Sequence, residues 1–408
     1  MGAAMYGQRA WRRKSAKRAR SSGRYTGAHE GTALPRSPQS VSQAPSNPVV
    51  IWFGRVGDMI MLSALLEILH RRYGKPCRII GAGTWTAEIY GAHRDVVEVR
   101  CLGRHTAFFL DPEWWRALRA LRAARGCPVY VCEDFPSKLP RVRRLLRWSG
   151  TPASHCVFME EMLAAARRRG QAPEHWVDRL VELGRCTPPA FREADFPWPE
   201  PAPRCAPRLT VTPEARAQCR AWLEERGWLD RPLVLVQPGN QRTMKSRSRP
   251  RLAADDHKAW PLERWVALLQ DVHRRMPQAI IILVGAPQEA AFLEWIRGAT
   301  KGPPVHTAVL SLTRLFALCA VSHSMISVDT GPAHAAAALG LPLVVLFGAY
   351  PPSLWKPRSA VGSPVIGVGG PPTASRLDQI AEPVVFEAWC GLLERLRVDT
   401  SESHGKCS

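Results

Sequence analysis

Short apolar runs that alternate with amphipathic segments constrain the fold of this 408-residue chain more than any other feature. Residues 49–54 read VVIWFG, and apolar side chains then recur at helical spacing from Ile60 to Leu69. Further apolar runs and an amphipathic segment continue the alternation: CRIIGAG (77–83), VVEVRCLG (96–103), WWRALRALRAARG (114–126) and PVYVCED (128–134). Strands that alternate with helices form a parallel, doubly wound sheet. We therefore expect a Rossmann-like domain over residues 47–190.

A proline-rich segment separates this series from a second one. Residues 191–212 include FPWPEPAPRCAP, which cannot continue a helix or a central strand and therefore predicts a linker. The alternation then resumes, which predicts a second Rossmann-like domain over residues 213–376, followed by a helix and polar tail over 377–408. The expected fold class is α/β, with two Rossmann-like domains and a cleft between them.

Basic residues are concentrated at the N-terminus of a chain whose net charge is +21. Residues 1–46 hold nine Lys and Arg residues and only Glu30 as an acid. The composition favours a disordered, solvated tail over a specific nucleic-acid site, although a nucleic-acid-binding protein that uses this tail stays an alternative. Such a tail would also attract the protein to an anionic membrane surface, by about 1 kcal/mol for each basic residue near the lipid.

Several classes of protein are disfavoured by what the sequence lacks. The longest apolar stretches, such as 341–347, are far shorter than a membrane span, and the N-terminus has no signal-peptide core. The eleven cysteines and twelve histidines show no metal-ligand spacing, so we expect reduced thiols and no metal site in a cytoplasmic protein. The sequence has no GxGxxG after its first strand, no P-loop motif and no GxSxG elbow.

Polar residues follow one of the predicted strands in MISVDTGPAH. Asp329 and Thr330 come directly after the apolar run, Gly331 allows a tight turn, and Pro332 favours the start of a helix. Ligands bind outside the carboxyl ends of strands in open parallel sheets, and the free N–H groups of a helix start attract anions. The alternative is an ordinary strand-to-helix turn in which Asp329 is the N-cap.

Cations that could assist such an anion site follow another predicted strand. The segment 239–261 carries several basic side chains: Arg242, Lys245, Arg247, Arg249, Arg251 and Lys258. This density of positive charge suits a diphosphate, whereas the alternative is a solvated basic loop.

Four segments, in this order, resemble glycosyltransferase family 9, the heptosyltransferases of lipopolysaccharide core synthesis: GRVGDMIMLSALLEIL, KAWPLERW, LVGAPQEAAF and DTGPAHAAAALGLPLVVLFG. The resemblance covers roughly residues 48–395. It implies a GT-B fold that holds the donor in the C-terminal domain and the acceptor mostly in the N-terminal one. It also implies inverting transfer of L-glycero-D-manno-heptose from ADP-heptose, with no metal and no cofactor besides this nucleotide-sugar donor.

The resemblance also implies roles for individual residues. Asp58 matches the catalytic base, and the start of its own helix is expected to keep its carboxylate ionised. Asn240, Lys258, Glu289, Asp329, Thr330, Gly331 and His334 match positions on the donor side, with Lys258 on the phosphates and Glu289 on the ribose. The residues alone favour an ordinary N-cap as the interpretation of Asp58. They likewise favour packing at a helix entry over adenine stacking for Trp260.

The chain departs from the family pattern at a few positions, which keeps alternatives open. Leu62-Ser63-Ala64 stands where family members often have Thr-Pro, and the basic tail and Arg-rich loop are additional. A different nucleotide-sugar or a protein acceptor is therefore the alternative to a lipid-linked saccharide acceptor. Only Cys390 and Cys407 lie near the C-terminus, so the four-cysteine iron site of one branch of the family is not expected. With a lipid acceptor, we expect peripheral attachment at the cytoplasmic face of the inner membrane.

Overall fold

The computed structural model describes residues 47–103, 110–245 and 258–404, and gives only the backbone of Lys245 and of residues 397–404. The basic tail (1–46) and part of the Arg-rich loop (Arg247, Arg249 and Arg251) lie outside the described residues, as does Cys407.

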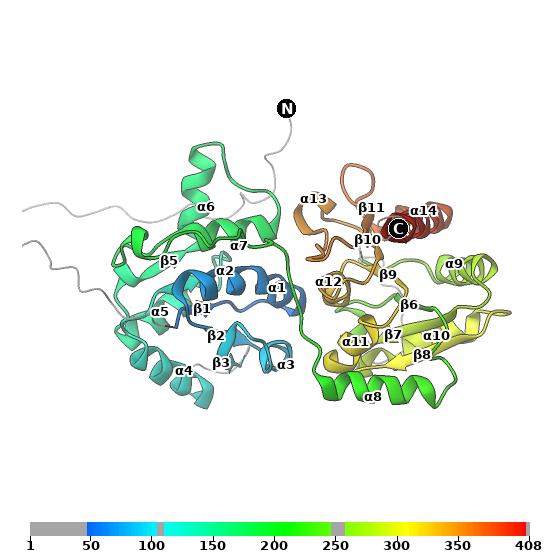
Figure 1. The fold of residues 1–408 in the computed structure, drawn as a ribbon, viewed down its shortest axis with the longest axis horizontal. Helices are drawn as coiled ribbons and strands as arrows, with labels where there is room; N and C mark the ends of the chain where they lie inside the picture. The colour runs from blue at the N-terminus through cyan, green and yellow to red at the C-terminus, as the bar shows by residue number, and fades with distance from the viewer. Residues whose placement is uncertain (1–46, 104–109, 246–257, 405–408) are drawn as a thin grey trace, which may run out of the picture. The chain divides into compact units, whose positions relative to one another are not determined.

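The first part of the chain forms a parallel sheet with the strand order β3-β2-β1-β4-β5. Its strands are β1 (Val49–Ile51), β2 (Cys77–Ala82), β3 (Val96–Leu102), β4 (Val129–Val131) and β5 (Cys156–Phe158). In Figure 1 these strands are coloured from blue to green. The order 3-2-1-4-5 is that of a Rossmann-like sheet. The chain adds β2 and β3 on one side of β1, then crosses over and adds β4 and β5 on the other side.

Helices cover both faces of this sheet. They are α1 (Val56–Met61), α2 (Ser63–Tyr73), α3 (Trp85–Tyr90), α4 (Pro112–Ala123), α5 (Leu139–Ser149), α6 (Met159–Arg168) and α7 (Trp176–Arg185). Val49 and Ile51 on one face of β1 pack with α4 and α5. Val50, on the other face, packs in a cluster with residues of α1, α2, α3, α6 and α7. Because both faces are buried, β1 is apolar at successive positions.

The second sheet is also parallel and has the order β11-β10-β9-β6-β7-β8. Its strands are β6 (Leu233–Gln237), β7 (Ile280–Gly285), β8 (Val305–Val309), β9 (Ser324–Val328), β10 (Leu343–Phe347) and β11 (Val365–Gly369). Counted from β6, the order is 6-5-4-1-2-3, which is again the Rossmann arrangement.

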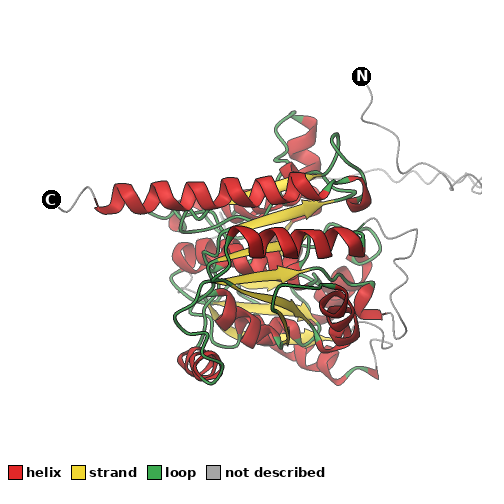
Figure 2. Ribbon diagram, turned by 90° about the vertical axis from the view of Figure 1, so that its right-hand side faces the viewer, coloured by secondary structure: helices red, strands yellow, loops and turns green. Residues whose placement is uncertain are grey.

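Helices cover both faces of the second sheet as well. They are α8 (Pro213–Glu224), α9 (Leu262–Arg275), α10 (Ala290–Ala299), α11 (Leu312–Cys319), α12 (Gly331–Ala338), α13 (Pro352–Trp355) and α14 (Glu382–His404). Val234 and Val236 pack with α9, α10 and α14, whereas Leu233 and Leu235 pack with α8, α11 and α12. Figure 2 shows α14 as the long helix that leads to the C-terminus. Short 3-10 helices occur at Ala153–His155, Glu193–Asp195, Thr243–Lys245, Pro287–Glu289 and Leu377–Gln379.

The expected α/β fold with two Rossmann-like sheets is thus confirmed, and some element boundaries differ from those expected. The last helix begins at Glu382 rather than at residue 377. The carbonyl of Ile380 accepts hydrogen bonds from the Trp260 indole (2.9 Å) and the Arg264 guanidinium (2.6 Å) instead of from a helical N–H. The helix therefore begins only after this residue. The same contact confirms that Trp260 packs at a helix entry, where its side chain is buried.

Candidate active site

Each sheet has one place where the strand order reverses, between β1 and β4 in the first sheet and between β6 and β9 in the second. Ligands of open parallel sheets bind at the carboxyl ends of strands beside such a switch point. Asp58 lies in the helix that follows β1, and Asp329 directly follows β9. Both of the turns that the sequence singled out therefore lie at a switch point.

Asp58 is the third residue of α1 and is half-buried. One of its carboxylate oxygens accepts a hydrogen bond from the Arg55 N–H at 2.7 Å, so the side chain belongs to a capping box rather than serving as the N-cap. A Cβ on residue 54 would lie only 2.6 Å from the Asp58 Cβ. Gly54 therefore allows the Asp58 side chain to fold back over the turn after β1.

The electrostatic surroundings of Asp58 differ from those expected. Burial raises the pKa of Asp58 and outweighs the Arg55 N–H bond and the charges of Lys138 and Arg55, which lower it; Asp134 raises it further. The start of the helix was expected to favour the ionised form of Asp58, and burial acts on this carboxyl in the opposite direction. A carboxylate whose pKa is raised holds a proton more strongly, which makes it a better general base.

Charged residues after β4 adjoin this turn, and the sequence analysis did not select them. The Lys138 ammonium donates to the carbonyl of Phe53 at 3.0 Å and lies 3.4 Å from the carboxylate of Glu133. Glu133 is fully buried and accepts a hydrogen bond from the Phe53 N–H at 3.4 Å. The available signal was the position of Glu133 and Asp134 directly after an apolar strand, at the edge where β1 also ends.

On the second sheet, three residues predicted for the donor side are brought together. The Lys258 ammonium donates to the carboxylate of Asp329 at 2.7 Å and to its carbonyl at 2.8 Å. The Asn240 amide donates to the carbonyl of Lys258 at 3.1 Å. Asp329 and Asn240 are buried, so this cluster is fixed within the switch point between β6 and β9.

Thr330 is the N-cap of α12, but its hydroxyl does not cap the helix. It donates instead to the side-chain oxygen of Gln237 at 2.8 Å, and Ser327 donates to the same oxygen at 3.0 Å. Among the described residues, no side chain caps the first turn of α12, which begins at Gly331. Pro332 has no N–H, and those of Ala333 and His334 donate to the Thr330 carbonyl, so the Gly331 N–H and the positive end of the helix are what this turn offers to an anion. Gln237 was missed because an amide at the end of an apolar strand carries no motif.

Glu289 is placed differently from the other donor-side residues. Its side chain is only 3% exposed, and it accepts hydrogen bonds from the Thr243 hydroxyl at 2.7 Å and the Ala286 N–H at 2.9 Å. A Cβ on Gly239 would lie 1.9 Å from a Glu289 oxygen, so the carboxylate packs directly on the turn after β6. Burial raises the pKa of Glu289. The structure thus joins Glu289 to the Asn240 turn through Thr243, and the ribose contact stays a prediction.

Helices α1 and α12 contact each other through glycine. A Cβ on Gly331 would lie 2.7 Å from the Val56 Cγ1, and a Cβ on Gly57 would lie 3.1 Å from the His334 Cδ2. The glycines therefore allow a backbone approach that brings the turn of Asp58 to the turn of Asp329. His334 is buried at this contact, where desolvation lowers its pKa to about 4, so its imidazole is neutral at physiological pH.

A second contact joins α7 to α13 and the residues that follow it. The Trp176 ring stacks between those of Trp52 and Trp355, at centroid distances of 5.9 and 5.1 Å. The Arg358 guanidinium donates two hydrogen bonds to the Asp178 carboxylate, at 2.5 and 2.7 Å, and these bonds hold the pKa of Asp178 below its usual value. None of these pairings was predicted, because Trp52 and Trp176 are far apart in sequence and the partners in α13 and beyond are farther still.

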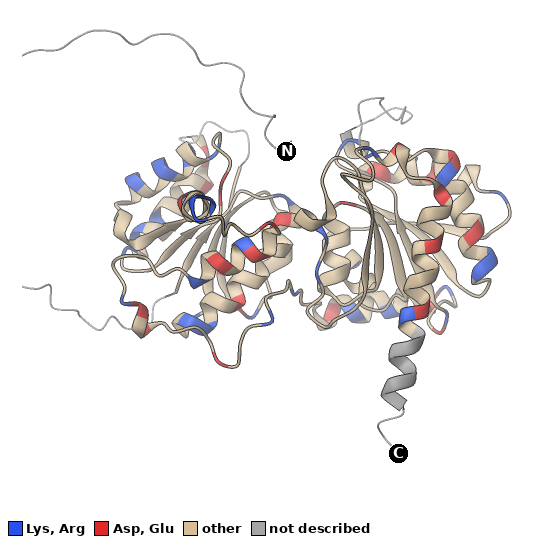
Figure 3. Ribbon diagram, turned by 90° about the horizontal axis from the view of Figure 1, so that it is seen from above, with Lys and Arg blue, Asp and Glu red and all other residues tan. Residues whose placement is uncertain are grey.

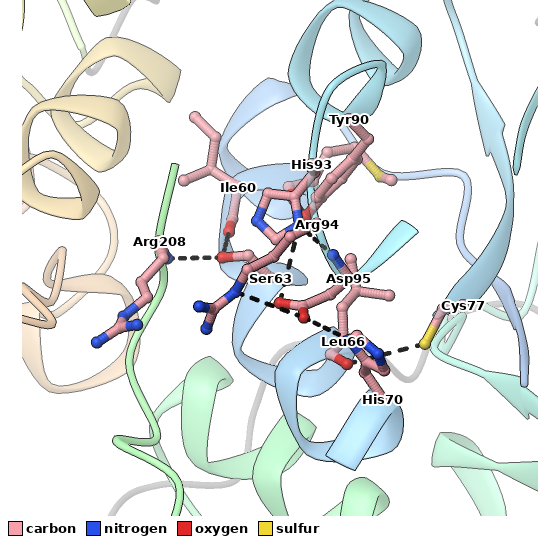
Figure 4. A network of polar contacts seen from close by, with 11 residues as sticks. Ile60, Ser63, Leu66, His70, Cys77, Tyr90, His93, Arg94, Asp95 and Arg208 are labelled. Atoms are coloured by element: carbon pink, nitrogen blue, oxygen red, sulfur yellow. Dashed lines mark hydrogen bonds and ion pairs between the residues drawn. The ribbon is translucent and has the colours of Figure 1, made fainter. Parts of the chain in front are cut away.

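Hydrogen bonds behind α1 hold the end of this helix (Figure 4). The Ser63 hydroxyl donates to the carbonyl of Ile60 at 2.8 Å and accepts from the Arg208 N–H at 2.8 Å. The Tyr90 hydroxyl donates to the carbonyl of Met59. Ser63, in the segment that departs from the family pattern, therefore ties α1 to the chain between α7 and α8.

No group of His, Cys, Asp and Glu side chains within the described ranges is arranged to hold a metal ion. Across the same ranges, no helix is long and apolar enough to cross a membrane. Figure 3 shows Lys and Arg distributed along helices and loops of both sheets, with acidic residues among them.

Two Rossmann-like sheets whose switch points carry polar residues define an α/β protein of the GT-B type, and solved structures share this fold. The crystal structure of a family 9 glycosyl transferase from Veillonella parvula DSM 2008 matches with a TM-score of 0.64 at 15% identity, over 86% of this chain and 99% of that one. Escherichia coli ADP-heptose lps heptosyltransferase II matches with a TM-score of 0.61 at 19% identity, over 86% of this chain and 99% of that chain. E. coli heptosyltransferase WaaC with ADP matches with a TM-score of 0.57 at 18% identity, over 85% of this chain and 99% of that chain.

The sequence itself identifies the family. The profile of glycosyltransferase family 9 (heptosyltransferase) matches residues 158–371, more than half of the chain. The chain belongs to glycosyltransferase family 9 and is a glycosyltransferase. A curated relative, lipopolysaccharide heptosyltransferase 3 of E. coli, is 31% identical over 104 residues, which is 25% of this chain. The matched segment spans 31% of the length of that relative.

Proposed function

We propose that this glycosyltransferase transfers a heptose from ADP-heptose to a lipopolysaccharide core acceptor, with inversion and without a metal ion. The observation that carries the proposal is the contact of α1 with α12, through which the turns of Asp58 and Asp329 adjoin. An inverting transfer needs a base near the acceptor hydroxyl and a stabilised leaving group on the other side of the sugar. The similarity to E. coli lipopolysaccharide heptosyltransferases, one of them solved with ADP, supports the choice of donor and acceptor.

The donor side of the proposed site is the switch point of the second sheet. Lys258 and the uncapped start of α12 at Gly331 would hold the diphosphate, and stabilise the negative charge that develops as ADP departs. In the structure, Asp329 holds the Lys258 ammonium in this position. Asn240, Thr330 and His334 would shape the same site, and Glu289 would bind the ribose after the Thr243 contact opens.

The acceptor side is the switch point of the first sheet. The Asp58 carboxylate would take the proton of the attacking hydroxyl, a role that its raised pKa favours. The charges of Lys138 and Asp134 act on the same carboxylate in opposite directions, which tunes its basicity. Residues 47–190 would thus form the acceptor domain, residues 191–212 the linker, and residues 213–376 the donor domain, followed by a C-terminal helix and tail over 377–408.

The proposed acceptor is a lipid-linked saccharide, so the enzyme would work at the cytoplasmic face of the inner membrane. Attachment would be peripheral and electrostatic, because the chain has a net charge of +21. High salt should then release the full-length protein from membrane fractions, whereas retention that only detergent reverses would contradict this part of the proposal.

The test is a transfer assay in which donor and acceptor are varied independently. The full chain is incubated with a lipopolysaccharide core precursor and ADP-heptose, ADP-glucose or UDP-glucose, and products are identified by mass spectrometry. A product one heptose heavier, formed only from ADP-heptose, would support the proposal. Transfer from another nucleotide-sugar, or to a protein acceptor alone, would replace it by the alternative within the family. Protection from thermal unfolding by each nucleotide gives an independent measure of donor binding.

A further inference from the structure

A cavity of about 350 Å³ lies on the first sheet, between its edge strand β3 and helix α4. Its lining combines guanidinium groups with small side chains: Arg78, Glu98, Arg100, Arg116, Arg119, Ala120 and Ala123. Arg78 lies near the start of β2, whereas Asp58 follows the carboxyl end of the neighbouring strand β1. The cavity is therefore separate from the switch point that carries the proposed active site.

The charged residues occupy a sheet face that is otherwise apolar. Ile80 on β2 and Leu102 on β3 lie on the face covered by α4 and belong to the core there. Because side chains alternate along a strand, Arg78 shares the face of Ile80, and Arg100 shares the face of Leu102. Across from these guanidiniums, α4 contributes alanine, which leaves space instead of filling it. Charged side chains at positions that normally pack against a helix cost free energy unless partners compensate their charge.

The guanidinium groups are only partly compensated. Glu98 pairs with Arg100 at 2.6 Å and lies 3.6 Å from the Arg78 Nε. That Nε is shielded from solvent and has no hydrogen-bond acceptor among the described residues. Arg116 pairs with Glu113 on its own helix, and the Arg119 guanidinium has no hydrogen-bond or ion-pair partner in the described part of the chain. The cavity therefore has an excess of positive charge and unused donors.

From this arrangement we propose that the cavity is a phosphate-binding site for a phosphomonoester group. Guanidinium groups present paired N–H donors that match phosphate oxygens, and several of them at one site can balance a dianion. The phosphate would provide acceptors for Arg119, which has no partner in the described part of the chain, and would add to the ion pair of Arg78 with Glu98. It can come from free phosphate or from a phosphorylated lipid headgroup. The second source would fix the first sheet at a membrane surface, independently of the proposed transfer reaction.

Site-resolved chemical protection tests this proposal on the full chain. Phenylglyoxal modifies accessible arginines, and the rate at each residue is read by peptide mass spectrometry with inorganic phosphate or with chloride at equal ionic strength. Saturating ADP in both samples occupies the proposed donor site. Phosphate should slow the modification of Arg119 and Arg100 several-fold and leave Arg147, an exposed arginine of α5, unchanged. Equal protection of Arg119 and Arg147 would overturn the proposal.

A matched pair of variants separates the two sources of phosphate. Arg119→Gln should weaken phosphate binding about tenfold, the loss expected for one charged hydrogen-bonding group, whereas Arg147→Gln removes the same charge elsewhere and should have no effect. The variants are compared for flotation with phosphatidylcholine vesicles that contain phosphatidic acid, or phosphatidylserine at matched surface charge. Arg119-dependent binding to phosphatidic acid identifies a lipid headgroup, and Arg119-dependent binding of inorganic phosphate alone identifies a soluble one. Equal behaviour of both variants with both probes, at unchanged thermal stability, would overturn the site.

Discussion

Replacing Gly331 by Ala tests whether the contact between α1 and α12 sets the geometry of the transfer site. A Cβ at this position would lie 2.7 Å from the Val56 Cγ1, 2.9 Å from the Val56 Cβ and 3.3 Å from the Gly57 N. Carbon atoms at optimal contact are about 3.5–4.0 Å apart, so the two helices have to separate by roughly 1 Å. The turns of Asp58 and Asp329 would separate with them.

The size of the effect follows from this displacement. A misplacement of about 1 Å at a reacting centre can lower a rate by about 100-fold, and overpacking costs about 1–3 kcal/mol of stability. We therefore expect Gly331→Ala to lower kcat/KM by about 10- to 100-fold while the protein stays folded. Binding of ADP should change much less than turnover, because Lys258 and Asp329 stay on the second sheet together.

The assay measures ADP release with ADP-heptose and a core acceptor, beside thermal unfolding and ADP affinity of the same preparation. Gly298→Ala is the matched control, since a Cβ there meets nothing within 4 Å on α10. Removing this helical glycine should raise stability by about 0.5–1 kcal/mol and leave turnover unchanged. A Gly331→Ala enzyme that turns over like Gly298→Ala would refute the reasoning that the α1–α12 contact sets the site.

Three further predictions follow from the same site. Lys258→Ala should weaken ADP binding far more than adenosine binding, as isothermal titration can measure, and equal losses would exclude a phosphate role. Lys138→Met removes a charge that lowers the pKa of Asp58, so the acidic limb of the pH profile of kcat/KM should move to higher pH. An acidic limb that stays in place or moves to lower pH would contradict the assignment of Asp58 as the base. Enzyme treated with EDTA should keep full activity, and activity that returns only with Mg²⁺ or Mn²⁺ would disprove metal independence.

The sheets were predictable because buried parallel strands appear in the sequence as continuous apolar runs. β9 and β10 are buried at every position, and the sequence between them specified the turn at Gly331 and the small residues of α12. The location of Asp58 and Asp329 at strand ends was predictable for the same reason, since polar residues that follow such runs reach the same edge of the sheet.

The partners of these residues were not predictable, because they come from distant strands. Nothing local in the sequence indicates that Thr330 would donate to Gln237, or that Lys138 would lie beside the turn after β1. The effect of burial on the pKa of Asp58 was not predictable, because burial depends on the packing of other elements around α1, whereas the helix start is a local feature. Glu289 illustrates the same limit, since its burial depends on the turn at Gly239.

The assignment of Asp58 as general base is tested most directly by Asp58→Asn. This change keeps the shape of the side chain and an oxygen that can accept from the Arg55 N–H, but removes the proton acceptor. The measurement is turnover and ADP-heptose affinity on one folded preparation. Loss of a general base lowers rates by about 10²- to 10⁴-fold, so we expect turnover to fall in this range with donor affinity retained. Turnover close to that of the unmodified enzyme would contradict the account and leave Asp58 with only its capping role.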